Sequence, residues 1–367
     1  MPASSQPNLA WRLVKPAIFA VMPRLSGLAL RATQRPFKQT SILKPHVGGH
    51  RYGWTHYGLM IPDLPEPHRY FSTMIIAGLP GATALDNDDA VTTSPRDTAT
   101  VSVSTAAPGA EFFGAYSMTQ ECDLRPDGSH LGFGDDVTIT GTYPDFQVTM
   151  RGDQFAAEFN LTATGQVVWF ARTPVYDHLS LCVEYDGWVS VGGDRTEVSG
   201  VGSFEYAACA GLHGLLDRPL DASSKAPVDF FSYHVIGIDD RSHLLLADVH
   251  ATGVPLATMA YHRTAGGTTW ATHEDVRLEV TEYATETTID PYGNAMRLPV
   301  RFTWTAGTEL VVHGTVDSPP RFGVGRGYIL GYQSEGTFQG RDFHARGYME
   351  YIDCEAADRA SPDFPSA

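Results

Sequence analysis

Hydrophobic and polar residues alternate one by one over many short stretches of this chain. The stretches 155–162, 179–185 and 296–304 show the pattern most clearly. A period of two is typical of a strand with one packed side and one side facing water. From about residue 46 such stretches recur at roughly ten to fifteen residues, with Gly, Pro, Asn and Asp between them, which predicts an antiparallel sandwich or barrel.

Two copies of one pattern follow each other along the chain. Gly-Ser-Phe-Glu-Tyr-Ala-Ala-Cys at 202–209 returns as Gly-Tyr-Met-Glu-Tyr-Ile-Asp-Cys at 347–354, and a Phe-Ser run at 71–76 resembles the run at 231–236. We interpret the Phe-Ser run as the opening strand of each copy and the other signature as its closing strand. Closing each copy into a barrel would leave no long unpaired edge. The predicted parts are an extension at 1–45, a first barrel at 46–211, a linker at 212–227, a second barrel at 228–356 and a disordered tail at 357–367.

The N-terminal extension differs from the rest in composition. Residues 1–62 hold eight basic residues and no acidic one, and residues 9–32 predict short amphipathic helices limited by Pro16 and Pro23. Three interpretations remain open. The helices pack on the barrel exterior, or they rest on an anionic membrane surface through residues 9–44, or they form a targeting segment.

Composition narrows the classes of partner and compartment. A net charge of −16 argues against a nucleic-acid partner. The four cysteines are too sparse for a disulfide framework, and no stretch is apolar for long enough to span a membrane. We therefore expect a cytoplasmic protein, peripheral to a membrane if the extension binds one. The oligomeric state is not predicted.

The second half resembles a known family. It carries Phe-Ser-Tyr-His-Val-Ile-Gly-Ile-Asp-Asp at 231–240, Tyr-Gly-Asn-Ala-Met-Arg-Leu-Pro at 292–299 and Tyr-Gln-Ser-Glu-Gly at 332–336, then the closing signature. That order resembles the double-lipocalin family of carotenoid 1,2-hydratases (hydroxyneurosporene synthases) and AttH-like proteins, with fungal lipocalin-like Diels–Alderases as distant relatives. The resemblance implies an all-β fold of two tandem lipocalin-like antiparallel β-barrels with an N-terminal helical extension. It also implies a pocket for an apolar terpenoid or polyketide.

Candidate catalytic residues come from residue type and position. Motifs for nucleotides, phosphates, zinc proteases or serine hydrolases are absent, and the histidines at 234, 243, 250, 262 and 273 have no metal-ligand spacing, so we predict no cofactor and no metal. His234 lies in mid-strand among aromatic residues, where an imidazole with a pKa near neutrality could transfer a proton. Tyr233 and Tyr283 are the other catalytic candidates, and a histidine satisfied within the core is the alternative for His234.

Aromatic residues along the strands predict a binding site for an apolar ligand. Large flat side chains line such sites, and they equally form ordinary barrel cores. The ligand-binding candidates are Trp54, Tyr57, Phe231, Trp270, Tyr332 and Glu335.

Three functions remain open at this point. The first is an enzyme that binds a terpenoid, steroid, lipid or polyketide and performs cofactor-free acid–base chemistry on it: hydration, dehydration, isomerisation or cyclisation. The second is a non-catalytic carrier of such molecules. The third is a structural protein that docks on a membrane through its basic N-terminus.

Overall fold

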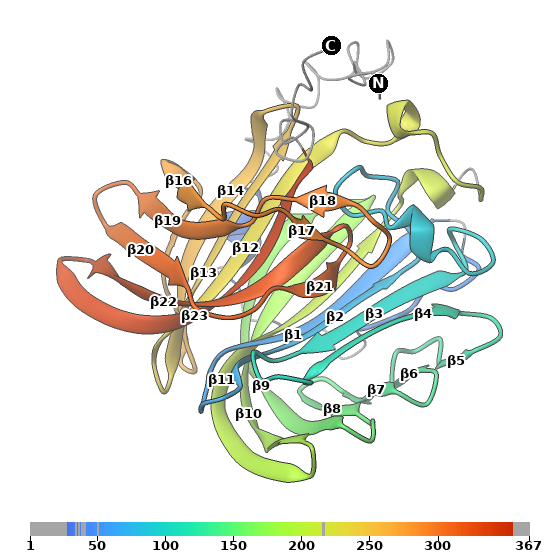
Figure 1. Cartoon of the computed structure of the whole chain (residues 1–367), viewed down its shortest axis with the longest axis horizontal. Helices are drawn as coiled ribbons and strands as arrows, with labels where there is room; N and C mark the ends of the chain where they lie inside the picture. The colour runs from blue at the N-terminus through green and yellow to red at the C-terminus, as the bar shows by residue number, and fades with distance from the viewer. Residues whose placement is uncertain are drawn as a thin grey trace, which may run out of the picture.

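The computed structural model describes residues 28–33, 35, 37, 42–49, 51–214 and 217–354. These residues form two large curled antiparallel sheets that pack side by side, the first in blue and green and the second in yellow and red (Figure 1). The predicted all-β fold of two tandem lipocalin-like barrels is confirmed. Hydrogen bonding does not run fully round either sheet, because each strand order has two ends.

The first sheet has eleven strands in the order β4-β3-β2-β1-β11-β10-β9-β8-β7-β6-β5. Its end strands β4 and β5 follow each other in the chain, so one short turn joins the two edges. The strands are β1 (Trp54–Leu64), β2 (Arg69–Ala77), β3 (Thr98–Ser104), β4 (Glu111–Ser117), β5 (Cys122–Leu124), β6 (His130–Phe133), β7 (Val137–Thr142), β8 (Asp145–Met150), β9 (Phe155–Arg172), β10 (Tyr176–Val191) and β11 (Asp194–Cys209).

The second sheet runs β15-β14-β13-β12-β23-β22-β20-β19-β16, with β21 beside β22, while β17 and β18 pair separately. The strands of this half of the chain are β12 (Val228–Asp239), β13 (Ser242–Ala251), β14 (Val254–Thr264), β15 (Gly267–Thr272), β16 (Val276–Tyr283), β17 (Thr288–Ile289), β18 (Ala295–Met296), β19 (Pro299–Ala306), β20 (Leu310–Val316), β21 (Arg321–Val324), β22 (Gly327–Phe338) and β23 (Arg341–Asp353). Short 3₁₀ turns lie at Asp88–Ala90, Leu212–Gly214 and Ala222–Ser224. The finer domain boundaries 46–211, 212–227 and 228–356 stay a prediction.

The closing strands of the two copies, β11 and β23, are equivalent in the structure. In each copy the closing strand lies between the first strand, β1 or β12, and the preceding long strand, β10 or β22. Gly187 and Gly336 occupy matching places on these long strands. A Cβ on either glycine would lie 2.0 Å from a backbone carbonyl oxygen of the neighbouring strand, Glu158 or Val311. Both copies therefore use a glycine where two strands approach too closely for any side chain.

The predicted equivalence of the two Phe-Ser runs is wrong. Phe71 lies in β2, the second strand of its copy, whereas Phe231 lies in β12, the first strand of the other. The opening strand of the first copy is instead β1, which begins at Trp54, because β1 pairs with β11 as β12 pairs with β23. The run 296–304 is also split, since Met296 ends β18 and Pro299 begins β19. Proline has no backbone N–H for a sheet ladder and commonly begins a strand.

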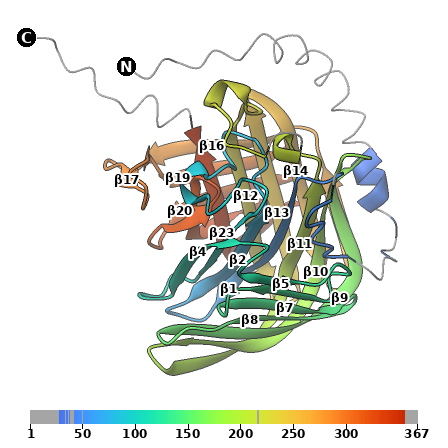
Figure 2. The same cartoon turned by 90° about the vertical axis from the view of Figure 1, so that its right-hand side faces the viewer.

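Two hydrophobic cores hold the fold together. One fills the interior of the first sheet, with Phe71, Phe133, Phe159 and Phe204 fully buried. The other fills the second sheet and continues onto the outer face of the first, where it includes Met60 and other side chains of β1 and β2. The views in Figures 1 and 2 show β1, β2 and β11 lying against the second sheet. The two barrels thus share an interface that is apolar where β1 and β2 meet the second sheet.

The described part of the extension is short. Residues 28–33 are helical, and the Thr33 hydroxyl accepts a hydrogen bond from the backbone of Trp169 at 3.0 Å, which attaches this turn to β9. The rest of the predicted helical segment and the tail at 357–367 lie outside the described residues. Membrane contact through residues 9–44 stays a prediction. Among the described residues no helix has the length and apolar character needed to cross a membrane.

Candidate functional site

The interface between the two sheets holds an unusual concentration of buried ionisable side chains. It is built from the outer faces of β1, β10 and β11 and of β12, β13, β14 and β23. Alternation decides which residues reach it: on β12 Tyr233 points to the first sheet, whereas His234 points into its own barrel. We call the polar side chains at this interface the inter-sheet cluster: His56, His178, Ser180, Ser203, Glu205, Tyr233, His243, Arg263 and Glu350.

Tyr233 and Glu205 join the two sheets at the centre of the cluster. The Tyr233 hydroxyl donates to Glu205 Oε1 at 2.6 Å and lies 3.2 Å from the Ser203 hydroxyl. Burial and the nearby carboxylate raise the pKa of Tyr233 well above its usual value, so the phenol keeps its proton. Burial alone would raise the pKa of Glu205, but the adjacent imidazoles of His178 and His56 lower it well below the usual value. A protonated phenol thus faces a carboxylate.

Arg263 reaches across the interface from β14. Its guanidinium donates to the Ser180 hydroxyl at 2.9 Å, to the Ser203 hydroxyl at 2.6 Å and to His243 Nε2 at 2.9 Å. The arginine, both serines and the histidine are completely buried. Burial and the neighbouring guanidinium lower the pKa of His243 well below its usual value, so this imidazole accepts as a neutral base. Burying a charge in this way costs stability unless every donor finds an acceptor.

Glu350 is the second-copy counterpart of Glu205. It accepts a hydrogen bond from the Tyr348 hydroxyl at 2.8 Å, and that hydroxyl lies 3.0 Å from the Ser72 hydroxyl of the first sheet. Burial, with a smaller contribution from Glu205, raises the pKa of Glu350 well above its usual value. Glu350 is therefore held as the neutral acid.

His56, His178 and Glu205 bring three potential metal ligands together on the first sheet. One ring nitrogen of each histidine and a Glu205 carboxylate oxygen all lie within 4.8 Å of one another. His178 Nε2 is 3.4 Å and His56 Nε2 3.9 Å from Glu205 Oε2. Burial lowers the pKa of His178, against the opposing effect of Glu205. The three side chains come from β1, β10 and β11, which are neighbours in the sheet.

His234 lies inside the second barrel, beside the predicted ligand-binding residue Tyr332. Its Nδ1 is 3.0 Å from the Tyr332 hydroxyl and its Nε2 3.0 Å from the Ser232 hydroxyl. The rings of Phe302 and Trp304 pack edge-on against the imidazole. Burial lowers the pKa of His234 well below its usual value. The geometry is that of a neutral core histidine, the alternative left open from the sequence, and a catalytic role for His234 stays a prediction.

The remaining predicted residues are dispersed over the molecule. Trp54 lines a cavity of about 200 Å³ at the start of β1, and Tyr57 is buried in the first core against Tyr206. Phe231 packs at the edge of the second core. The structure does not gather these three around one site.

Three further candidates lie in the second barrel. Trp270 packs against Phe338, with ring centroids 5.3 Å apart. The Tyr283 hydroxyl is 3.3 Å from the Tyr351 hydroxyl. Glu335 is exposed, with its carboxylate 3.9 Å from His344. Tyr283 contacts Tyr351, Tyr233 contacts Glu205 and His234 contacts Tyr332, so the three predicted catalytic residues do not converge.

A cavity of about 890 Å³ opens between the sheets, further along the strands that carry the cluster. Its lining includes Ser199–Val201 of β11 and Gly237–Asp239 of β12, with Asp63 and Arg346 nearby. Partial burial raises the pKa of Asp63, while Arg346 opposes the shift. The lining of the cavity is mainly polar and carries charged groups of both signs, with Val201 and Ile238 among its apolar side chains.

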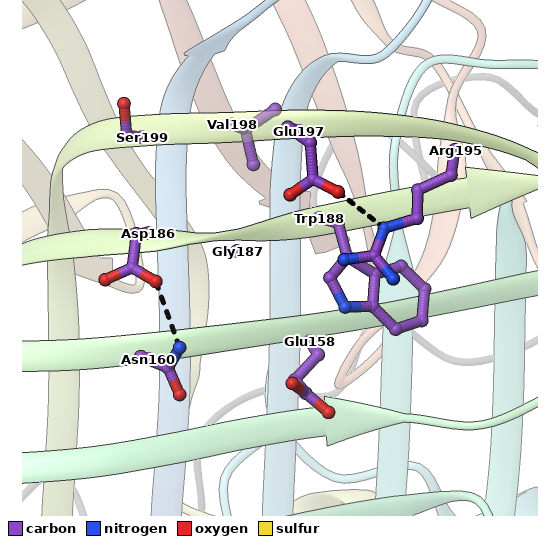
Figure 3. A pocket seen from close by; sticks show the side chains of 9 residues that line it. All are labelled: Glu158, Asn160, Asp186, Gly187, Trp188, Arg195, Glu197, Val198 and Ser199. Carbon is purple, nitrogen blue, oxygen red and sulfur yellow. Dashed lines mark hydrogen bonds and ion pairs between the residues drawn. The ribbon is translucent and has the colours of Figure 1, made fainter.

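A smaller cavity of about 420 Å³ lies on the outer surface of β9, β10 and β11. Figure 3 shows its lining: the Arg195 guanidinium stacks on the Trp188 ring at 4.3 Å and donates to Glu197 at 2.6 Å, while Asn160 donates to Asp186 at 3.0 Å. These groups are exposed and already paired. We regard this surface as solvated and place the candidate site between the sheets.

Sequence reasoning identified Tyr233 but missed its partners. Glu205 belongs to the closing signature, and a glutamate inside an apolar strand, repeated at Glu350, is itself a signal. No local spacing indicates His56, His178 or Arg263, because they meet only when separate strands and separate sheets come together.

Two solved structures share this fold over most of their length. An AttH protein from Nitrosomonas europaea is 14% identical, with a TM-score of 0.56, and the match covers 87% of this chain and 97% of the other. Kievitone hydratase from Nectria haematococca is 11% identical, with a TM-score of 0.56, covering 88% and 94%. At such identities the likeness concerns the fold. The predicted resemblance to AttH-like proteins is confirmed at that level, and the relation to carotenoid hydratases stays a prediction.

Comparison of sequences gives a more limited result. No curated protein sequence matches this chain significantly. A family model matches residues 74–363, from β2 to beyond the last strand. The chain therefore belongs to the family of unknown function DUF6670.

Proposed function

We propose that this protein binds a small molecule with an apolar body between its two sheets and catalyses the addition of water to it, or the reverse elimination. The observation that carries the proposal is the hydrogen bond of 2.6 Å from Tyr233 of one sheet to Glu205 of the other. Clusters of buried ionisable groups with strongly shifted pKa values occur preferentially at functional sites.

The chemistry of the pair suits proton transfer. The raised pKa of Tyr233 keeps the phenol protonated at neutral pH but also makes it a weaker acid, so it can serve as a general acid only with help from a neighbouring positive charge. Its proton would form the new C–H bond while water forms the new C–O bond. The proton released by the attacking water would return to the tyrosine–glutamate pair, so neither protons nor electrons are left over. Arg263, which lowers the pKa of Tyr233, would stabilise the transient phenolate.

The cavity of about 890 Å³ supplies a place for the ligand, since small-molecule sites commonly measure roughly 300–1,000 Å³. Val201 lies four residues from Glu205 on β11, and Gly237 lies four residues from Tyr233 on β12. Four residues of strand correspond to about 13 Å. An elongated molecule held in the cavity could therefore extend along the interface toward the pair.

The comparison of folds also supports hydration as the proposed reaction. Kievitone hydratase, which shares the two-barrel fold, is by name a hydratase. Fold alone does not determine reaction, so the proposal rests on the inter-sheet cluster rather than on this likeness.

A second candidate function, a non-catalytic carrier, is favoured by one observation. Tyr233 and Glu205 are each only 3% exposed and satisfy each other, as in a network that merely docks two barrels. In that case the ligand would occupy the cavity and undergo no reaction.

Ligand binding is tested by native mass spectrometry of protein purified from its source, with bound molecules extracted and identified. Gly237 lines the cavity, and a Cβ there would meet Asp63 and Pro62 at 3.4–3.5 Å, an ordinary contact. We expect wild-type protein and Gly237→Ala to carry a ligand and Gly237→Leu to lose it. A folded wild-type protein that carries no small molecule would contradict both the enzyme and the carrier.

A further inference from the structure

His56, His178 and Glu205 converge on one point as metal ligands do. The short Ala207 lies between the two histidines, because it pairs with His56 on one side and with His178 on the other. Glu205 lies two residues before Ala207 on β11 and therefore points to the same face. The two histidine nitrogens lie 3.9 and 3.4 Å from Glu205 Oε2. Tetrahedral ligands at zinc bond lengths of about 2.0–2.1 Å are separated by about 3.3 Å, so small side-chain movements would close the site.

Each of the three side chains is held by a hydrogen bond on the side that faces away from the proposed metal ion. His56 Nδ1 lies 3.0 Å from the backbone carbonyl of Ile75, which can only accept, so Nδ1 carries the proton. Nε2 of the same imidazole faces the Glu205 carboxylate at 3.9 Å, on the side where a cation would bind.

The other two ligands have similar partners. His178 Nδ1 lies 2.8 Å from the Tyr176 hydroxyl, and the free oxygen of Glu205 accepts from Tyr233 at 2.6 Å. Ligating histidines and carboxylates in metal sites are almost always oriented by such outer hydrogen bonds. All three side chains here have one.

We propose that His56, His178 and Glu205 bind a divalent transition-metal ion of the zinc class. Two imidazoles and one carboxylate suit Zn²⁺, Fe²⁺ or Co²⁺ better than Ca²⁺ or Mg²⁺, which prefer oxygen ligands. Three protein ligands leave a coordination position open, as in catalytic rather than structural zinc sites. His178 is the most exposed of the three, with 15% of its side chain accessible.

The proposal stands independently of the reaction. If the proposed hydration takes place, a metal ion here would bind the water that adds to the substrate, a role that rests on the proposed function. Binding of the ion can be measured without any substrate, so failure of one proposal does not decide the other.

Calorimetric titration of the full chain with Zn²⁺ alone, after treatment with a chelator, tests the site. We expect a single zinc ion per chain, and a Co²⁺ complex with the intense visible absorption of a tetrahedral site. His56→Ala, His178→Ala and Glu205→Gln should each weaken zinc binding by about 100-fold or more. His130→Ala is the matched control, since His130 forms an imidazole–carboxylate pair with Asp123 at 3.3 Å outside the cluster.

Circular dichroism of each variant shows whether it is folded, and only folded variants are compared. At least two of the three ligand positions give an independent measurement if one substitution prevents folding. Wild-type protein that binds no zinc ion overturns the proposal. Folded variants at His56 and His178 that bind zinc as tightly as the His130→Ala control also overturn it.

Discussion

Glu205 and Glu350 stand at the same position of the two copies but are held in opposite protonation states. Each lies on a closing strand, opposite Gly58 of β1 or Tyr233 of β12. Two imidazoles beside Glu205 keep its pKa well below the usual range in spite of burial, whereas burial and the charge of Glu205 keep the pKa of Glu350 well above it. One repeated residue thus supplies both an anion and a neutral acid to the same interface.

The two glutamates should therefore respond differently to the same substitution. Glu350→Gln keeps a neutral side chain with an acceptor for Tyr348 and should change the free energy of unfolding by less than about 1 kcal/mol. Glu205→Gln removes the charge that Tyr233 and His178 contact and should cost about 2–3 kcal/mol. Denaturant unfolding at neutral pH measures both. Equal losses for the two variants would show that their protonation states do not differ.

Arg263 should be among the most sensitive charged residues of the protein. Arg263→Met keeps most of the side-chain volume but leaves Ser180, Ser203 and His243 without their donor, and should lower the free energy of unfolding by about 3–5 kcal/mol. Arg241→Met is the control, because the Arg241 side chain is 77% exposed and its ion pair with Glu184 is long, at 3.8 Å. The control should lie within about 0.5 kcal/mol of wild type. A similarly small loss for Arg263→Met would mean that the network does not hold the sheets together.

His234 should make the protein less stable in acid. Burial lowers its pKa in the folded state, so the unfolded chain binds the proton first as the pH falls below about 6.5. The stability that the neutral histidine contributes to the folded state is fully present above that pH. It is lost as the pH falls toward the folded-state pKa. When the pH falls from about 7.5 to 5, one such histidine lowers the free energy of unfolding by about 2 kcal/mol. His234→Gln should reduce the pH dependence of the unfolding free energy by about that amount, and the exposed His313→Gln should not. An unchanged slope in His234→Gln would contradict the assignment of a neutral histidine.

Gly187 and Gly336 should be irreplaceable in both copies. A Cβ at either position would lie 2.0 Å from a backbone oxygen, which cannot move without disturbing the adjacent strand. Alanine at either site should cost more than about 3 kcal/mol, by analogy with severe overpacking. Gly340→Ala is the control: it has a positive φ of 74° but no atom nearby, and should cost about 1 kcal/mol. Thermal unfolding of the three variants tests this prediction. A small loss of stability in Gly336→Ala would disprove the close approach of the two strands.

Local patterns predicted the fold well because the alternation of residues within each strand reflects which of its sides is buried. The alternation in 155–162 became β9 with Phe155, Ala157 and Phe159 buried, and the repeated closing signature became β11 and β23. The Phe-Ser match failed because a two-residue identity between strands is weak, and strands with one apolar face resemble one another. Pairing with the closing strand, which sequence does not show, identifies β1 as the true counterpart of β12.

The candidate site could not be predicted from the sequence of any single strand. His234 and Tyr332, both named from the sequence, do meet, because the barrel interior brings strand faces of one copy together. Tyr233 and Glu205 belong to different copies, and only docking of the two outer faces joins them. A shift of one residue in β12 would have exchanged the places of Tyr233 and His234. Which of the two faces the interface is fixed by register and not by residue type.

The most direct test of hydration between the sheets uses water labelled with heavy oxygen. Purified wild-type protein and Tyr233→Phe are incubated in labelled water with an extract of small molecules from the source, and products that have gained labelled water are identified by mass spectrometry. We expect at least one such product with wild-type protein, formed roughly 10²–10⁴ times more slowly by folded Tyr233→Phe. Equal labelling by both proteins, or no labelled product with wild type, would contradict the proposed role of the Tyr233–Glu205 pair.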